Sequence, residues 1–155
     1  MERKKLLTSA LSSAVNTAVK ESQLDQRPLS SDTSNRICNV IEAIFIHGLK
    51  EVYFDEDSST TIGVKEKYPE PNFWPFLSRL VHRSIRMQIR GLSQIKSDIG
   101  RARCCLRMCL NQGDLNSYID VLVRESSSVK RYYHRYAYLR DAEQLEILRN
   151  YMKGV

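Results

Sequence analysis

Apolar residues recur at every third or fourth position along almost the whole chain of 155 residues, which is the period of an amphipathic helix. Near the N-terminus this stripe consists of Leu7, Ala10, Leu11, Ala14 and Ala18. In residues 35–50 it consists of Ile37, Ile41, Ile44 and Phe45. No segment alternates convincingly between apolar and polar residues, as a half-buried strand does. The pattern therefore predicts an all-α fold, a single-domain bundle of about eight helices over residues 1–155.

Polar residues that favour helix N-termini precede several of these runs. The candidate caps are Ser34, Asn72, Asp98 and Asp114, and Asp141 with Gln144 has the spacing of a capping box. We expect a leading helix within residues 1–21, before the interruption at Arg27-Pro28. Residues 52–71 are acidic and polar, so we predict a surface loop there.

Charge is distributed unevenly along the chain. The 24 basic and 18 acidic residues give a net charge of +6. Between Arg79 and Arg107 there are eight basic residues and a single acid, Asp98, so this segment alone carries +7. Residues 51–70 contain six acids and two lysines. A localised positive charge attracts an anionic partner, which can be an acidic protein surface, a lipid headgroup or a nucleic acid.

The arginines of the basic segment follow helical spacings. Arg79, Arg83, Arg86 and Arg90 are four, three and four residues apart, which puts them on one side of any continuous helix. Arg101 and Arg103 are about 200° apart on a helix and cannot share a face. Two arrangements remain open for this pair. Either Arg101 points outward from the first turn while Arg103 stacks one turn before Arg107, or one of the two is buried against an acid such as Glu42.

No catalytic constellation accompanies this charge. The chain lacks a Gly-x-Ser-x-Gly motif and a glycine-rich phosphate loop, so we predict that it is not an enzyme and uses no cofactor. The cysteines (Cys38, Cys104, Cys105 and Cys109) lack the paired spacing of zinc ligands, so we predict no metal site and free thiols of a reducing compartment. No apolar run is long enough to span a membrane, and we expect a cytoplasmic protein.

Two other binding modes fit parts of the sequence. An anionic membrane surface would attract the same basic segment without any protein partner. The segment from Lys130 to Arg140 mixes basic residues with tyrosines, as surfaces that stack nucleic-acid bases do. The helical spacing of Val129, Tyr132, Tyr133 and Tyr136 favours core packing instead, and we predict no nucleic-acid partner.

Several spaced blocks together resemble a RUN domain. They are residues 37–49 (ICNVIEAIFIHGL), 73–77 (FWPFL), 98–103 (DIGRAR), 106–111 (LRMCLN), 132–133 (YY) and 139–143 (LRDAE). The resemblance covers roughly residues 34–155 and is strongest to the N-terminal RUN domains of pleckstrin-homology adaptors that act on late endosomes and lysosomes. Cys104-Cys105 departs from the pattern, because an alanine-tryptophan pair is common at that place.

The resemblance implies a non-catalytic effector module that binds a GTP-loaded small GTPase, of the Arf-like class or, as the second choice, of the Rab class. It also implies recruitment to the cytosolic face of lysosomes and late endosomes, in their positioning or fusion. Since the chain ends just after a helix, we expect it to be an N-terminal fragment of a larger adaptor. The residues expected to contact the GTPase, in one exposed patch, are His47, Lys50, Arg86, Arg90, Arg101, Arg103 and Arg107.

Overall fold

A computed structural model describes residues 2–25, 31–55 and 70–152. In these ranges it contains eight α-helices: α1 (Glu2–Asp25), α2 (Ser31–Ile46), α3 (Trp74–Leu80), α4 (Arg83–Arg90), α5 (Asp98–Gln112), α6 (Leu115–Arg124), α7 (Ser126–Tyr132) and α8 (Ala142–Met152). The prediction of an all-α fold is confirmed. None of the described helices combines the length and the apolar character needed to cross a bilayer.

Short elements join some of these helices. Two single turns of 3₁₀-helix are present, η1 (Glu51–Tyr53) and η2 (Tyr138–Arg140). Strand β1 (Phe54–Asp55) pairs antiparallel with β2 (Glu70–Pro71), so the expectation that the chain forms no strand is wrong at the two ends of the predicted acidic loop. Residues 56–69 of that loop lie outside the described residues.

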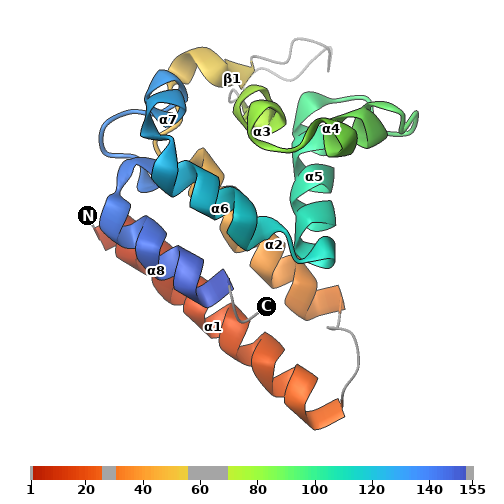
Figure 1. Cartoon of the computed structure of the whole chain (residues 1–155), viewed down its shortest axis with the longest axis vertical. Coiled ribbons are helices and arrows are strands. Elements are labelled where there is room, and N and C mark those ends of the chain that lie inside the picture. Colours follow the sequence, from red (N-terminus) through yellow and green to blue (C-terminus); the bar gives the residue numbers. More distant parts are fainter. Residues whose placement is uncertain (1, 26–30, 56–69, 153–155) are drawn as a thin grey trace, which may run out of the picture.

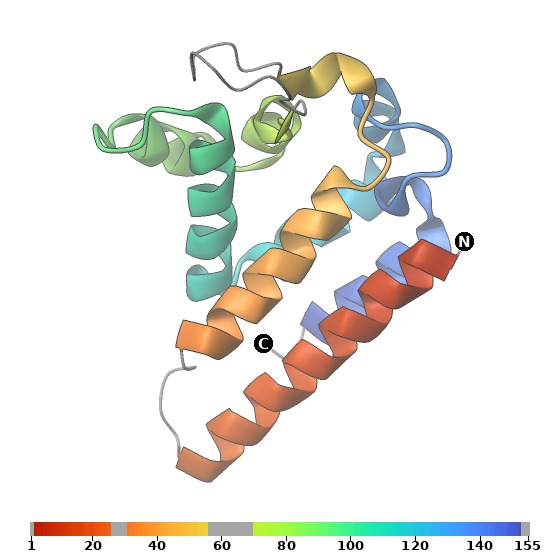
Figure 2. The same cartoon turned by 180° about the vertical axis from the view of Figure 1, so that it is seen from behind.

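The helices pack around α2. One side of α2 contacts α1, which also runs alongside α8, and the other side contacts α5 (Figures 1 and 2). Helices α3 and α4 pack against α5 at the end where α5 begins (Figure 1). Helix α6 contacts α5, α7 and α8 and thereby closes the core between the two halves of the chain.

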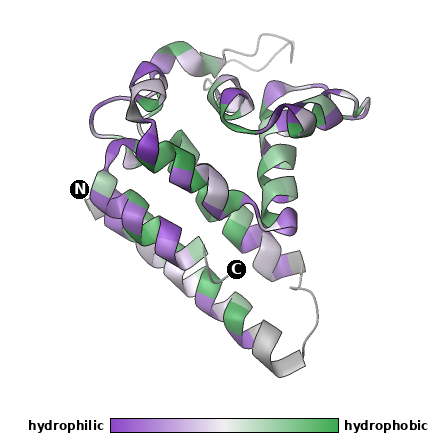
Figure 3. Ribbon diagram, in the orientation of Figure 1, coloured by the Kyte–Doolittle hydropathy of each residue, from purple (hydrophilic) through white to green (hydrophobic). Residues whose placement is uncertain are grey.

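The core contains the residues that the helical period singles out. The inward residues of α2, Ile37, Ile41, Ile44 and Phe45, are all at most 3% exposed. The ring of Phe45 lies against Phe73 and Phe76, with centroids 5.9 and 6.2 Å away, so α2 and α3 share one aromatic cluster. Hydrophobic and hydrophilic residues alternate along the ribbons in Figure 3, as expected for helices that bury one side.

Polar contacts fix α1 to the last part of the chain. The Thr8 hydroxyl donates to Gln144 Oε1 at 2.7 Å and lies 2.6 Å from the Tyr138 hydroxyl, while Lys4 forms an ion pair with Asp141 at 2.9 Å. The Gln144 backbone N–H donates to Asp141 Oδ1 at 3.2 Å, as predicted for a capping box. The Gln144 side-chain oxygen accepts from the Thr8 hydroxyl, so this oxygen makes a tertiary contact.

Helix starts differ from the predicted caps by up to a few residues. Helix α2 begins at Ser31, ahead of the predicted cap Ser34. Ser97 rather than Asp98 caps α5, because its hydroxyl accepts the Gly100 N–H at 3.0 Å. Asn72 accepts the Trp74 N–H at 3.2 Å, and Asp114 precedes α6 without a side-chain capping bond.

Candidate partner-binding surface

The end of α2 pairs with a segment that follows α7. The Lys50 N–H donates to the Tyr132 carbonyl at 3.0 Å, and the His134 N–H donates to the Gly48 carbonyl at 2.8 Å. Leu49 and Tyr133 form an isolated antiparallel bridge, and the buried Tyr133 hydroxyl donates to the Phe45 carbonyl at 2.5 Å. Two sequence blocks more than eighty residues apart therefore form one structural unit at this corner.

His47 belongs to this unit through its ring. Its Nδ1 accepts the Tyr138 N–H at 3.0 Å, and the ring stands edge-on to Tyr136 with centroids 6.2 Å apart. Burial lowers the pKa of His47, and the nearby positive charges of Arg3 and Lys4 lower it further. The neutral imidazole with a proton on Nε2 is therefore the form that this contact requires.

A groove between α2 and α5 is lined by two of the exposed predicted arginines, Arg103 and Arg107. Arg103 Nε donates to Glu42 Oε1 at 2.5 Å, with side chains that are 64% and 17% exposed. Arg107 donates to the Asn35 side chain across the same groove, whose volume is about 330 Å³. The pairing of an arginine with Glu42 was one of the two open arrangements. Arg103 is nevertheless not buried by it, and its side chain stays exposed.

Arg101 occupies a more sheltered place at the start of α5. Its Nη1 donates to Asp98 Oδ1 at 2.8 Å, and the Arg101 side chain is 27% exposed. Asp98 also accepts a hydrogen bond from the Asn72 amide at 3.2 Å. This carboxylate therefore ties the start of α5 to the residues before α3, and it neutralises part of the charge that Arg101 brings.

Helix α4 presents a basic stripe. Arg83, Arg86 and Arg90 lie within about 60° of one another on an ideal helix, and the centre of this stripe is about 110° around the helix from the buried Ile85 and Ile89. Arg86 Nη1 donates to the Ser78 carbonyl at 2.9 Å. Arg79 does not belong to this stripe. The shared face required a continuous helix, and none joins the four arginines, because α3 ends at Leu80, Val81 is extended and α4 begins at Arg83.

The thiols beside the α2–α5 groove are not reactive groups. All four cysteines are free, with Cys105 and Cys109 buried and Cys38 and Cys104 half-buried. Burial raises the pKa of Cys38 and of Cys104, and the charge of Arg107 opposes the shift only in part. At neutral pH these thiols are protonated and contribute apolar surface to the groove wall.

The structure separates His47 from Arg103. Residues 42 and 47 are about 140° apart around an ideal helix, and Glu42 faces α5 whereas His47 faces the segment at Tyr138. The expected single patch is therefore divided. The arginines of α4 and α5 lie on the α5 side of α2, and His47 lies on the side that packs against α1 and residues 136–138.

Residues 36–155 match the sequence model of the RUN domain. The chain belongs to the RUN domain family. RUN domains are protein-interaction modules that generally bind small GTPases and are not a known catalytic family. In this RUN domain the blocks around Gly48 and Tyr133 pair at the end of α2, and Arg83, Arg90, Arg103 and Arg107 of α4 and α5 are exposed.

The tyrosine-rich segment of the RUN domain is mainly structural. Val129, Tyr132, Tyr133 and Tyr138 are at most 5% exposed, whereas Tyr136 is 60% exposed. Core packing was the favoured interpretation, and it is correct except at Tyr136. The helical spacing misleads there because α7 ends at Tyr132, and residues 133–137 turn back toward the end of α2.

The contact of His47 predicts a loss of stability in acid. A lowered folded pKa means that the unfolded chain binds more protons once the pH falls below about 6.5, so the free energy of unfolding decreases there. We expect a lower urea midpoint at about pH 5.5 than at about pH 7.5. His47→Asn offers an acceptor that does not titrate, so it should show a smaller decrease. An equal decrease in both proteins would rule out His47 as the cause.

Proposed function

We propose that this RUN domain binds the GTP-loaded form of an Arf-like small GTPase through the basic face formed by α4 and α5, with a Rab-type GTPase as the second choice. The observation that carries the proposal is the exposed side chain of Arg103. It lies at a groove that Cys38 and Cys104 help to line, in a domain of this family. Arg107 lies one turn further along the same side of α5. Arg101, Arg86 and Arg90 would contribute only if the interface extended around α5 to α4.

Nucleotide selectivity would come from the partner. A GTPase segment that is ordered by the γ-phosphate offers a fixed arrangement of carboxylates and apolar side chains, which the GDP form lacks. Arg103 uses Nε for Glu42, so its two Nη groups can bind a partner carboxylate in the planar manner that lysine cannot match. The apolar walls of the groove would supply affinity, while the charge steers the approach.

His47 and Lys50 take different parts in this proposal. We assign His47 a positioning role, because its Nδ1 is engaged by Tyr138 and its side of α2 faces away from Arg103. The half-buried Lys50 would contact the GTPase only if the interface reached the end of α2. Recruitment to lysosomes or late endosomes would then follow from where the GTPase resides.

Nucleotide-locked GTPases test the proposal. Purified RUN domain is immobilised, and a panel of Arf-like and Rab-type GTPases is passed over it in GTP-locked and GDP-locked forms. We expect at least one Arf-like member to be retained only when GTP-locked. Equal retention of both forms, or of neither form across the panel, would contradict the proposal.

An anionic membrane surface is the alternative, and one observation favours it. Met87 is 57% exposed within the α4 stripe, so an apolar side chain stands among three arginines, as it does in segments that lie on membranes. Sedimentation with vesicles separates the two functions. Binding that rises with the phosphatidylserine content and needs no GTPase would support the membrane surface, whereas GTP-dependent binding without vesicles supports the GTPase.

A further inference from the structure

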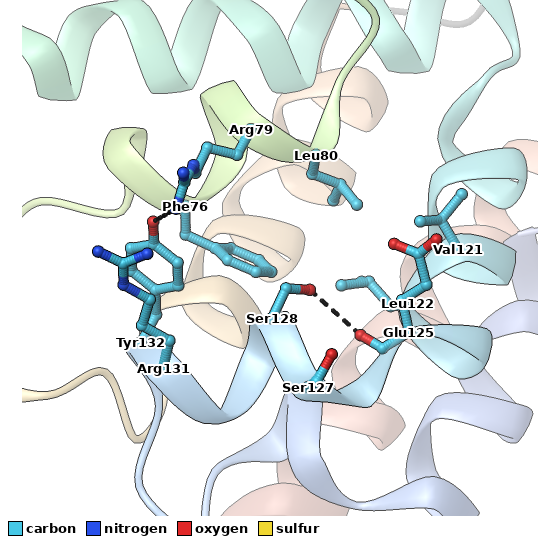
Figure 4. Close-up of a pocket in the computed structure, with 10 residues that line it drawn as sticks. All are labelled: Phe76, Arg79, Leu80, Val121, Leu122, Glu125, Ser127, Ser128, Arg131 and Tyr132. Atoms are coloured by element: carbon cyan, nitrogen blue, oxygen red, sulfur yellow. Dashed lines mark hydrogen bonds between the residues drawn. The ribbon is translucent and has the colours of Figure 1, made fainter.

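A second groove lies between α3, α6 and α7, built by residues that the GTPase proposal does not use (Figure 4). Its volume of about 360 Å³ falls within the range of about 300–1,000 Å³ that is usual for ligand sites. Phe76, Leu122 and Tyr132 form the floor and are at most 5% exposed, and the half-buried Leu80 forms one wall. The groove thus has an apolar interior and an exposed polar rim.

The floor of this groove is preformed. The Phe76 ring lies against Tyr132 and Tyr133, with centroids 5.3 and 5.1 Å away, in tilted and edge-on arrangements. The Ser128 hydroxyl donates to the Glu125 carbonyl at 3.1 Å and so fixes the joint between α6 and α7 (Figure 4). A ligand that entered would therefore lose little free energy to ordering the site.

Opposite charges stand at the two ends of the groove. Arg79 Nη1 donates to the Tyr132 hydroxyl at 3.0 Å, and the guanidinium carbon of Arg131 is 5.8 Å from the centroid of the same ring. In the described part of the chain neither arginine forms an ion pair with a carboxylate. The carboxylate of Glu125 lies at the other end, beside Val121 (Figure 4).

From this arrangement we propose that the groove binds a peptide segment of a partner protein in which a bulky apolar residue lies between an acidic and a basic residue. The apolar side chain packs on Phe76 and Leu122, and the acid binds the guanidinium groups of Arg79 and Arg131, which form no ion pair with a described carboxylate. A basic residue at the opposite end meets Glu125. A fatty acid fits less well, because its single charge would leave Glu125 against an apolar chain.

Selection from a random dodecapeptide library tests the inference without any GTPase. The library is displayed on phage and selected on the wild-type RUN domain, with counter-selection on Ser127→Trp, which fills the groove from an exposed rim position. Ser117→Trp, at an exposed position on α6 that does not line the groove, is the matched control. Melting curves of all variants show that each one is folded.

We expect enriched peptides that place a large apolar residue between an acidic and a basic residue. They should bind the Ser117→Trp control like the wild type, lose binding to Ser127→Trp, and bind Arg79→Gln/Arg131→Gln about tenfold more weakly. No enrichment, peptides without an acid, or equal binding to Ser127→Trp would overturn the inference. Enrichment of purely apolar peptides that oleate displaces would identify a lipid site and would overturn it as well.

Discussion

Gly48→Ala is expected to destabilise the fold strongly, although it adds only one methyl group. Gly48 has a φ of 75°, and a Cβ there would lie 2.4 Å from Ala137 Cβ and 2.5 Å from Ala137 Cα. The left-handed conformation costs a non-glycine residue about 1–2 kcal/mol, and overpacking of a buried contact adds about 1–3 kcal/mol. We therefore expect the free energy of unfolding to fall by about 3 kcal/mol, as measured by urea denaturation at neutral pH.

Gly113→Ala is the matched control for this variant. Gly113 has a φ of 73°, almost the same as Gly48, but no atom lies within 4 Å of a Cβ placed there. Only the backbone term remains, so the expected loss is about 1 kcal/mol. If the two variants lost the same free energy of unfolding, the close approach of Gly48 to Ala137 would not contribute to the destabilisation by Gly48→Ala.

Charge reversal at the α2–α5 groove is expected to have the largest effect on binding. In Arg103→Glu/Arg107→Glu, two cations that would face acidic groups of the GTPase become anions, and like charges across an interface cost several kcal/mol. We expect the affinity for the GTP-locked partner to fall at least about a hundredfold, as measured by isothermal titration calorimetry. The fold should lose about 1–2 kcal/mol, because the partly exposed Arg103–Glu42 pair contributes about 0.2–1 kcal/mol and the new like-charge pair costs a similar amount.

Two controls separate local contact from net charge. Arg124→Glu/Lys130→Glu changes the charge equally at exposed positions on α6 and α7, and it should retain nearly wild-type affinity. Glu42→Gln removes the carboxylate that holds Arg103, so it should bind at least as tightly as the wild type. If the α6–α7 variant lost as much affinity as the groove variant, the total charge rather than the groove would control binding.

The helical period predicted the core of this domain because burial follows the same geometry that produces the period. Ile37, Ile41, Ile44 and Phe45 are buried as predicted. Helix starts were less predictable where two capping residues are adjacent. Ser97 and Asp98 both have side chains that can cap a helix. Ser97 caps α5, whereas the Asp98 carboxylate binds Asn72 and Arg101, and the local sequence does not reveal these two contacts.

Contacts between distant segments account for what the sequence did not predict. Glu42 was named as a possible partner for one arginine, but nothing in the sequence decides that Arg103 is that arginine. Once this pair is known, helix geometry alone puts His47 on a different side of α2. The groove that contains Arg79 and Arg131 gave no signal, because its two cations come from helices fifty residues apart and meet only through Tyr132.

The site of GTPase contact is tested most directly by amide chemical shifts of the ¹⁵N-labelled RUN domain during titration with an unlabelled, GTP-locked Arf-like GTPase that it retains. We expect the largest shifts in residues 101–107 of α5 and in the neighbouring turns of α2 and α4, with little change in α8. Shifts confined to α6 and α7, or to α1 and α8, would show that the GTPase binds elsewhere on the domain and would contradict the account.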